Sequence, residues 1–181
     1  AGPSQELIDS YEMIDGTQPI LGYSDAEHLR PILNTASSYD PKNPYANRDP
    51  RFYASVYYNG AIRYLDQPNG DVVETYVGGN CGISDKVTDI RYTRTGYYMR
   101  KFNNFKSGIG QDADGLMRIF RLAELYLNFA EAAYQAVGPD GQVASKVGAE
   151  ALSARDAVNK IRVRAGIPAL SSGMSKDSFE K

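Results

Sequence analysis

The chain has 181 residues, of which 42% are hydrophobic, and it carries a formal net charge of -2 at pH 7. This length suits one domain with a real core, and the charge argues against a nucleic-acid partner, because no basic excess is present to displace phosphate counterions. No run approaches the roughly 20 apolar residues of a membrane span, the N-terminus lacks the pattern of a signal peptide, and the single cysteine, Cys81, excludes an internal disulfide framework.

The first third of the chain is rich in turn-forming residues. Residues 6–14 end at the turn signal Asp15-Gly16. Residues 17–32 are predicted to be irregular, with one helical turn near residues 25–29. Residues 38–50 contain three prolines and predict a folded loop, because proline biases the preceding residue away from the helical region.

The stretch YANRDPRFYASVYYNG, residues 45–60, combines charged residues with four tyrosines. Such a cluster could form a binding site, but its parts favour architecture. Asp49 before Pro50 fits a helix N-cap with proline at the first helical position. Arg48 and Arg51 would then tie this corner to neighbouring backbone or carboxylates.

Strands are expected after the short helix that begins at Pro50. A strand over residues 55–58 would end at Asn59-Gly60, which predicts a type I′ turn with positive φ at both positions. The returning strand would cover residues 61–65. Residues 71–77 and 95–102 would form further strands.

Two helices are predicted from residue 117 onward. In residues 121–136 the polar positions form one narrow stripe, which predicts that most of the helix circumference is buried. These polar residues are Arg121, Glu124, Asn128, Glu131 and Gln135. Glu124 and Glu131 are interpreted as partners of Arg121 and of polar groups on adjacent helices.

The second predicted helix covers residues 149–166 and has a broad charged face. Lys160, Arg162 and Arg164 lie near its C-terminus, where cations complement the helix dipole, and Gly166 with Pro168 would end it. Two such helices form a hairpin of the kind that stacks in tetratricopeptide-type (TPR) arrays.

Four segments, in their order along the chain, resemble the SusD/RagB family of outer-membrane glycan-binding lipoproteins. They are residues 45–60, 95–102, 121–136 and 158–168. The resemblance is to the central-to-C-terminal part of a longer family pattern, and it implies that residues 1–181 are part of a larger protein. No long linker, repeat or low-complexity tract divides these residues, so they are expected to form one packed unit. It implies an α+β fold, mainly α in the full family. A loop-rich half with short antiparallel strands, residues 1–116, would pack on a TPR-like helical hairpin, residues 117–168, with residues 169–181 starting a further segment.

The resemblance also implies a function. Family members bind oligosaccharide at the outer face of the outer membrane, are not enzymes, and act with a SusC-like TonB-dependent transporter. No cofactor, metal or nucleic acid is implied, and membrane contact would occur only through a lipid anchor that these residues do not include. The matching segments are scaffold motifs, so the resemblance transfers no sugar-contacting residue.

Sugar-contacting residues must therefore be nominated from chemistry. A sugar ring has an apolar C–H face and a rim of hydroxyls, so its site needs an exposed aromatic platform with flanking polar groups. For each candidate, an ordinary surface or packing role is the alternative. The 14 tyrosines of the chain, with six Phe and no Trp, supply most of the candidates, which are Tyr23, His28, Tyr64, Tyr76, Asn80 and Tyr92. Tyr126 and Tyr134, in the predicted helical hairpin, are expected in the core.

Other chemistries have weaker support. Cys81 and His28 could form a nucleophilic pair, but nothing in the sequence places them together. Residues 112–115 (DADG) begin like a calcium loop but lack its later ligands, and Gly108 and Gly110 lack the context of a phosphate loop. Two further hypotheses remain: a helical-repeat scaffold for protein partners without sugar binding, and a portion of a glycan-cleaving enzyme.

Overall fold

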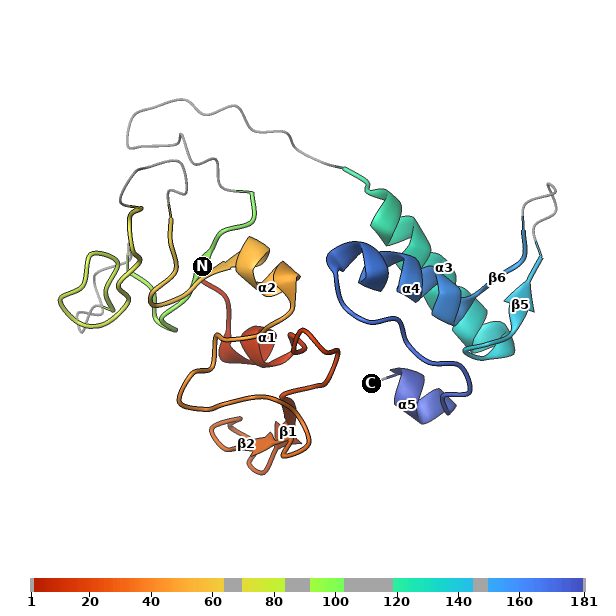
Figure 1. Cartoon of the computed structure of the whole chain (residues 1–181), viewed down its shortest axis with the longest axis horizontal. Coiled ribbons are helices and arrows are strands. Elements are labelled where there is room, and N and C mark those ends of the chain that lie inside the picture. The colour runs from red at the N-terminus through yellow and green to blue at the C-terminus, as the bar shows by residue number, and fades with distance from the viewer. Residues whose placement is uncertain (1, 64–69, 84–91, 103–118, 145–149, 181) are drawn as a thin grey trace. The chain divides into compact units, whose positions relative to one another are not determined.

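A computed structural model of the chain describes residues 2–63, 70–83, 92–102, 119–144 and 150–180 (Figure 1). The chain divides into two compact units, Ala1–Leu116 and Met117–Lys181, here called the N-terminal and C-terminal units. Helices and two-stranded antiparallel sheets occur together, so the predicted α+β class is confirmed. In the described part of the chain, no helix combines the length and the apolar character needed to cross a membrane.

The N-terminal unit begins with helix α1, Gln5–Asp9, and an antiparallel pair formed by β1, Ile20–Tyr23, and β2, Pro31–Leu33. The sequence prediction of irregular chain over these strands was wrong. An irregularity in the register between Ile20 and Gly22 interrupts the alternation of apolar residues that a strand normally shows.

The N-cap predicted at Asp49 is confirmed. Helix α2, Pro50–Ser55, begins with Asp49 as its N-cap, and the Asp49 carboxylate accepts the Arg51 backbone N–H at 2.8 Å. Arg48 is only 2% exposed, and its guanidinium donates to the carbonyl oxygens of Ile8 at 2.6 Å and Tyr11 at 2.9 Å. Both charged residues therefore hold the backbone of this corner.

Aromatic residues build the core of the N-terminal unit. Phe52 is completely buried beside Ile8, Val56 and Tyr97. Four more tyrosines pack against these residues: Tyr11, Tyr45, Tyr53 and Tyr58. Much of the tyrosine content thus serves packing, and only some of it is free to serve binding.

Strand pairing after α2 differs from the predicted order. β3, Val56–Tyr57, pairs with β4, Tyr98–Met99, and not with the strand predicted directly after it. The turn at Asn59-Gly60 is present, but only Gly60 has positive φ (90°), so it is not type I′. Asn59 accepts the Thr75 N–H at 3.0 Å, and residues 61–63 pair with residues 71–73 through a bridge between Ile62 and Val72.

The C-terminal unit contains the predicted helical hairpin. Helix α3, Leu122–Val137, packs on helix α4, Ala154–Ala165, and the sheet of β5, Gln142–Val143, and β6, Leu152–Ser153, lies beside them. Small residues let the helices approach closely: Ala130, Ala133, Ala154 and Ala157 are buried at their contact. Tyr126 and Tyr134, which were expected in the core, are partly buried against this cluster.

Helix α4 starts later than predicted and stops where predicted. Ser153 is its N-cap and accepts the Asp156 N–H at 3.0 Å, so the residues before it are free to form β6. Gly166 ends the helix in the left-handed conformation, at φ 85°.

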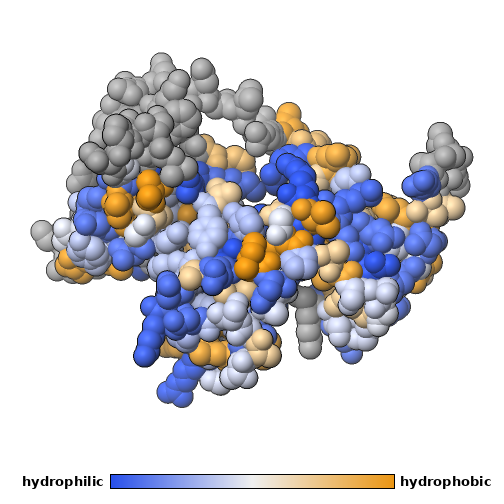
Figure 2. Space-filling view, viewed as in Figure 1, coloured by the Kyte–Doolittle hydropathy of each residue, from blue (hydrophilic) through white to orange (hydrophobic). Residues whose placement is uncertain are grey.

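The predicted burial of α3 was wrong. Ala130 and Ala133 are its only buried residues, whereas Leu122 is 65% and Leu125 56% exposed. Figure 2 shows apolar surface over the beginning of α3 and over the β1–β2 pair. Because its polar stripe is narrow, most of the circumference of α3 is apolar. The helix that packs on it, α4, covers only part of that apolar surface.

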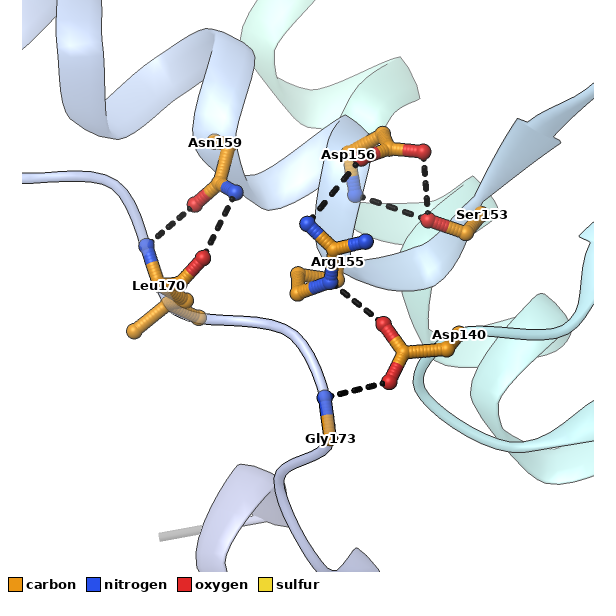
Figure 3. A network of polar contacts seen from close by, with 7 residues as sticks. All are labelled: Asp140, Ser153, Arg155, Asp156, Asn159, Leu170 and Gly173. Atoms are coloured by element: carbon orange, nitrogen blue, oxygen red, sulfur yellow. Dashed lines mark hydrogen bonds and ion pairs between the residues drawn. The ribbon is translucent and has the colours of Figure 1, made fainter.

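A polar network fastens the last part of the chain to α4 (Figure 3). The Asp140 carboxylate forms an ion pair with Arg155 and accepts the Gly173 N–H at 2.9 Å. The Asn159 side chain accepts the Leu170 N–H at 2.7 Å and donates to the Leu170 carbonyl oxygen at 3.2 Å. These contacts lead the chain to the short helix α5, Lys176–Glu180.

Candidate ligand-binding site

A cavity of about 390 Å³ lies in the N-terminal unit, where the β3–β4 pair meets the glycine-rich loop of residues 78–82. Its lining combines aromatic rings with a few polar groups, which is the usual composition of a small-molecule site. The lining residues are Tyr57, Arg63, Val73, Asn80, Cys81, Tyr92 and Tyr98.

Strand pairing positions two of the three rings. Tyr57 and Tyr98 are register partners across β3 and β4, and directly opposed side chains lie on the same face of a sheet. The Tyr98 hydroxyl accepts the Thr93 N–H at 3.1 Å and donates to the Cys81 carbonyl oxygen at 3.1 Å. These two bonds fix the Tyr98 ring and leave its hydroxyl little capacity for a ligand.

The glycine-rich loop requires its glycines. A Cβ atom on Gly79 would lie 2.5 Å from the Glu74 carbonyl oxygen, and one on Gly82 would collide with the Tyr76 carbonyl oxygen. Asn80 closes the same loop, because its side chain accepts the Glu74 N–H at 3.0 Å and donates to the Val72 carbonyl oxygen at 2.8 Å. Asn80 therefore shapes the cavity wall more than it offers free hydrogen bonds.

Tyr92 and Arg63 are the groups best placed to meet a ligand. Tyr92 lines the cavity and is 39% exposed. Arg63 pairs with the Asp71 carboxylate, and its Nη1 lies 3.5 Å from the Cys81 sulfur. The arrangement offers aromatic faces beside a guanidinium–carboxylate pair, which suits a ligand with an apolar face and a hydroxyl rim.

The structure brings two of the predicted site residues together in this cavity, Asn80 and Tyr92. Tyr76 belongs to the loop that carries Asn80 but does not line the cavity; it is 54% exposed, and a hydrogen bond to the Glu74 carboxylate raises the pKa of its hydroxyl. Tyr64 lies outside the described residues.

The other two predicted residues meet each other elsewhere in the same unit. The rings of Tyr23 and His28 are stacked, with centroids 4.3 Å apart and planes inclined by 6°. The nucleophilic pair of Cys81 and His28, which the sequence left open but did not favour, does not form: Cys81 lines the cavity, whereas His28 stacks on Tyr23 and its Nδ1 lies 3.5 Å from the Glu6 carboxylate.

Sequence reasoning missed Tyr57 and Tyr98, which were assigned to strands without a site role. Both belong to Tyr-Tyr pairs, Tyr57-Tyr58 and Tyr97-Tyr98, in which one ring is oriented to the core and the other to the cavity. A doubled aromatic residue in a predicted strand was therefore the available signal, since neighbouring strand residues face opposite sides.

Metal and phosphate sites gain no support from the described residues. No group of three or more His, Cys, Asp or Glu side chains capable of holding a metal occurs among them. Residues 112–115 and the glycines at 108 and 110 lie outside the described ranges.

Comparison with known proteins identifies the family. The profile of the SusD family (SusD/RagB) matches residues 1–181. No curated protein matches the chain.

Two solved structures from Bacteroides fragilis NCTC 9343 are similar. One is a SusD-like protein with 30% sequence identity and a TM-score of 0.66; the match covers 98% of this chain and 31% of that protein. The other is a SusD-like carbohydrate-binding protein with 24% identity and a TM-score of 0.62; the match covers 98% of this chain and 30% of that one. The chain thus spans about a third of the proteins it matches.

Proposed function

Since the chain belongs to the SusD family, we propose that it contributes an oligosaccharide-binding site to a cell-surface protein that is not an enzyme. The observation that carries the proposal is the cavity lined by Tyr57, Tyr92 and Tyr98 beside Arg63. A SusD-like relative described as carbohydrate-binding supports the same ligand class.

The cavity chemistry fits a sugar. The Tyr92 ring and the Tyr57 ring, which the Arg100 guanidinium covers from one face at 5.2 Å from the centroid, can stack on the C–H face of a pyranose. The Tyr92 hydroxyl and the Arg63 guanidinium, which is paired with Asp71, can bond sugar hydroxyls. The volume of about 390 Å³ lies within the range of small-ligand sites, so the cavity holds a short part of a glycan and not a long chain.

The proposal also covers what happens to the glycan after it is bound. We infer from family membership that the whole protein sits on the outer face of the outer membrane, held by a lipid anchor. There it passes bound glycan to a SusC-like TonB-dependent transporter. Binding without catalysis suits this role, since an imported oligosaccharide must leave the site unchanged.

Cys81 provides a direct test of the binding site, because it lines the cavity and is the single cysteine of the chain. The rate of Cys81 alkylation by iodoacetamide is measured with increasing concentrations of neutral gluco-, manno- and xylo-oligosaccharides. We expect at least one series to slow the reaction saturably, with the same dissociation constant that calorimetry gives.

Two tyrosine variants test whether the protection of Cys81 comes from a glycan bound in the cavity. Tyr92→Ala should abolish the protection of Cys81, whereas Tyr76→Ala, which removes an exposed tyrosine outside the cavity, should retain it. Protection that survives Tyr92→Ala, or the lack of protection by every glycan, would overturn the proposed site. Release of new reducing ends during incubation would overturn the non-enzymatic role.

A protein-interaction scaffold without sugar binding is the alternative, and the exposed Leu122 and Leu125 of α3 favour it. The same experiment separates the two functions. A scaffold predicts that no oligosaccharide changes the alkylation rate of Cys81.

A further inference from the structure

The stacked rings of Tyr23 and His28 form a second feature in the N-terminal unit that shares no residue with the cavity lining. Tyr23 is the last residue of β1, and His28 lies in the turn that leads to β2. The rings are nearly parallel, 4.3 Å between centroids, so the phenol covers one face of the imidazole.

The turn is built to hold the imidazole there. The Asp25 carboxylate accepts the backbone N–H of Leu29 at 2.9 Å and of Arg30 at 2.8 Å. His28 has a left-handed backbone, with φ 56°. Histidine is one of the few residues with a Cβ that adopt this conformation comparatively often.

Tyr23 provides a fixed backing for the imidazole. Its hydroxyl donates to the Asp9 carboxylate at 2.6 Å, and Asp9 is only 8% exposed. Burial and the neighbouring Asp9 raise the pKa of the Tyr23 hydroxyl, so the phenol stays protonated and keeps this bond. The hydrogen bond to Asp9 therefore fixes the Tyr23 ring, and a ligand that binds on His28 does not have to break that bond.

The outer side of His28 is accessible. Its side chain is 48% exposed although Tyr23 covers one face, so the exposure belongs to the other face and to the ring edge. The Glu6 carboxylate lies 3.5 Å from His28 Nδ1 and is 51% exposed. A backbone hydrogen bond, with smaller contributions from Ser4 and His28, lowers the pKa of Glu6, so the carboxylate is ionised and ready to accept hydroxyl groups.

We propose that His28, backed by Tyr23 and flanked by Glu6, is a second contact surface for a neutral sugar unit of a longer glycan. The imidazole face supplies the platform for the C–H face of the sugar, and Glu6 accepts its hydroxyl protons. The carboxylates of Glu6, beside His28, and of Asp9, beside Tyr23, disfavour an anionic sugar. The inference rests on the proposed glycan-binding function and adds that one chain holds a glycan at two places.

Two contacts on one ligand have a measurable consequence. A disaccharide is too short to occupy both places, whereas an oligosaccharide that occupies both makes the second contact at a raised effective concentration. The platform residues should therefore affect the affinity for long oligosaccharides and not for short ones.

His28 is the single histidine of the chain, so its imidazole Cε1–H resonance needs no assignment by mutation. That resonance is followed by NMR while neutral gluco-, manno- and xylo-oligosaccharides, from disaccharides to hexasaccharides, are added. We expect the longer members of one series to shift the resonance saturably, and His28→Ala to weaken their binding by about 3- to 10-fold without changing disaccharide binding. His28→Phe keeps a flat ring and should restore most of the affinity, whereas Leu29→Ala, a control at the next and more exposed position, should have no effect.

The alkylation rate of Cys81 reports on the cavity, and the NMR resonance of His28 reports on the second contact surface, so the two proposals can be tested separately. Protection of Cys81 with an unchanged His28 resonance and equal affinities for the His28 variants would overturn the second contact surface and leave the proposed function standing. If no oligosaccharide changes the Cys81 alkylation rate or the His28 resonance, both the proposed function and the second contact surface are overturned. If His28→Ala does not fold, the comparison of wild type with His28→Phe and His28→Ser decides the matter in the same way.

Discussion

Arg48 and Asp49 show how buried charge can be structural at the scale of single residues. Asp49 is fully buried and Arg48 is 2% exposed, yet both charges have partners: Asp49 accepts the Arg51 N–H in α2, and Arg48 donates to the Ile8 carbonyl oxygen in α1. The cap at Asp49 was predictable because its partner lies two residues away. The acceptors of Arg48 were not, because Ile8 and Tyr11 lie 40 and 37 residues before it.

Asp49→Ala should destabilise the N-terminal unit without affecting glycan binding. The substitution removes the N-cap bond to the Arg51 N–H, and a lost cap lowers the free energy of unfolding by about 1–2 kcal/mol. Chemical denaturation and calorimetry with an oligosaccharide would measure both quantities. Asp49→Asn, which keeps a cap acceptor, should cost less. A fall in affinity at unchanged stability would show instead that the corner is part of a binding site.

Gly79→Ala should damage the cavity through the backbone of its loop. The new Cβ would approach the Glu74 carbonyl oxygen to 2.5 Å, so the loop that carries Asn80 and Cys81 must shift. We expect faster Cys81 alkylation, weaker glycan binding and a loss of about 1–3 kcal/mol in unfolding free energy.

Gly60→Ala is the matched control for Gly79→Ala. Gly60 has φ 90° but open space around its Cβ position, so alanine there costs only backbone strain, about 1–2 kcal/mol, and should leave the cavity unchanged. Equal effects of the two variants on Cys81 alkylation would contradict the steric role of Gly79.

The site itself could be predicted only in part from residue chemistry. Asn80 and Tyr92 were nominated because they are polar or aromatic residues in turn-rich segments, and both line the cavity. Tyr57 and Tyr98 were not, because their meeting depends on two strands that lie 41 residues apart pairing with each other. A local pattern contains no information on such a partner.

At the scale of elements, helices α2, α3 and α4 were predicted, whereas the short helices α1 and α5 and the strands β1 and β2 were not, and no helix is present near residues 25–29, where one helical turn was predicted. The periodicity of α3 and the Gly166 stop of α4 are encoded within each helix, so both were found. Strands of two to four residues are too short for a pattern, and they exist only through their partners. The burial of α3 was overestimated for a related reason: an apolar stripe shows what a helix can bury, not what covers it.

Two substitutions on α3 should therefore differ clearly in their effect on stability. Leu125→Ser changes a residue that is 56% exposed and should alter the free energy of unfolding by no more than about 0.5 kcal/mol. Ala133→Leu forces extra volume into the contact with α4, where Ala133 is 4% exposed, and should cost about 1–3 kcal/mol. Urea denaturation of both variants would test this. A large loss for Leu125→Ser would mean that its side chain is covered in solution.

At the scale of the whole molecule, the two units rely on different contacts. The N-terminal unit has a core of large aromatic rings, whereas the C-terminal unit closes around four alanines. Small residues bury little apolar area, so polar contacts between distant segments gain importance in the C-terminal unit. The Asp140 carboxylate supplies such contacts, since it joins Arg155 and Gly173 in one cluster (Figure 3).

The stability of the C-terminal unit should accordingly depend on pH. The hydrogen bond from Arg155, followed by the Gly173 N–H, lowers the pKa of Asp140 below its ordinary value of 3.8, and the Ser153 hydroxyl lowers that of Asp156. A carboxyl whose pKa is lower in the folded than in the unfolded state stabilises the fold above the unfolded value. That stabilisation is lost as the pH falls through the folded value. The urea midpoint should therefore be constant near neutral pH and fall as the pH drops below the ordinary carboxyl range of about 4.

Asp140→Asn separates this contribution from general acid unfolding. Asparagine keeps an acceptor for the Gly173 N–H but loses the charge that pairs with Arg155, so the variant should be less stable than wild type at pH 7. The difference between the two proteins should shrink as the pH falls, because protonation removes the same charge from wild type. Because Asp140 is near the surface, where ions screen the pair, added salt should also reduce the difference at pH 7. A difference that stayed constant from pH 7 to about pH 2 would show that Asp140 acts through its shape and hydrogen bonds alone, and that the ion pair with Arg155 contributes nothing to holding residues 169–173 on α4.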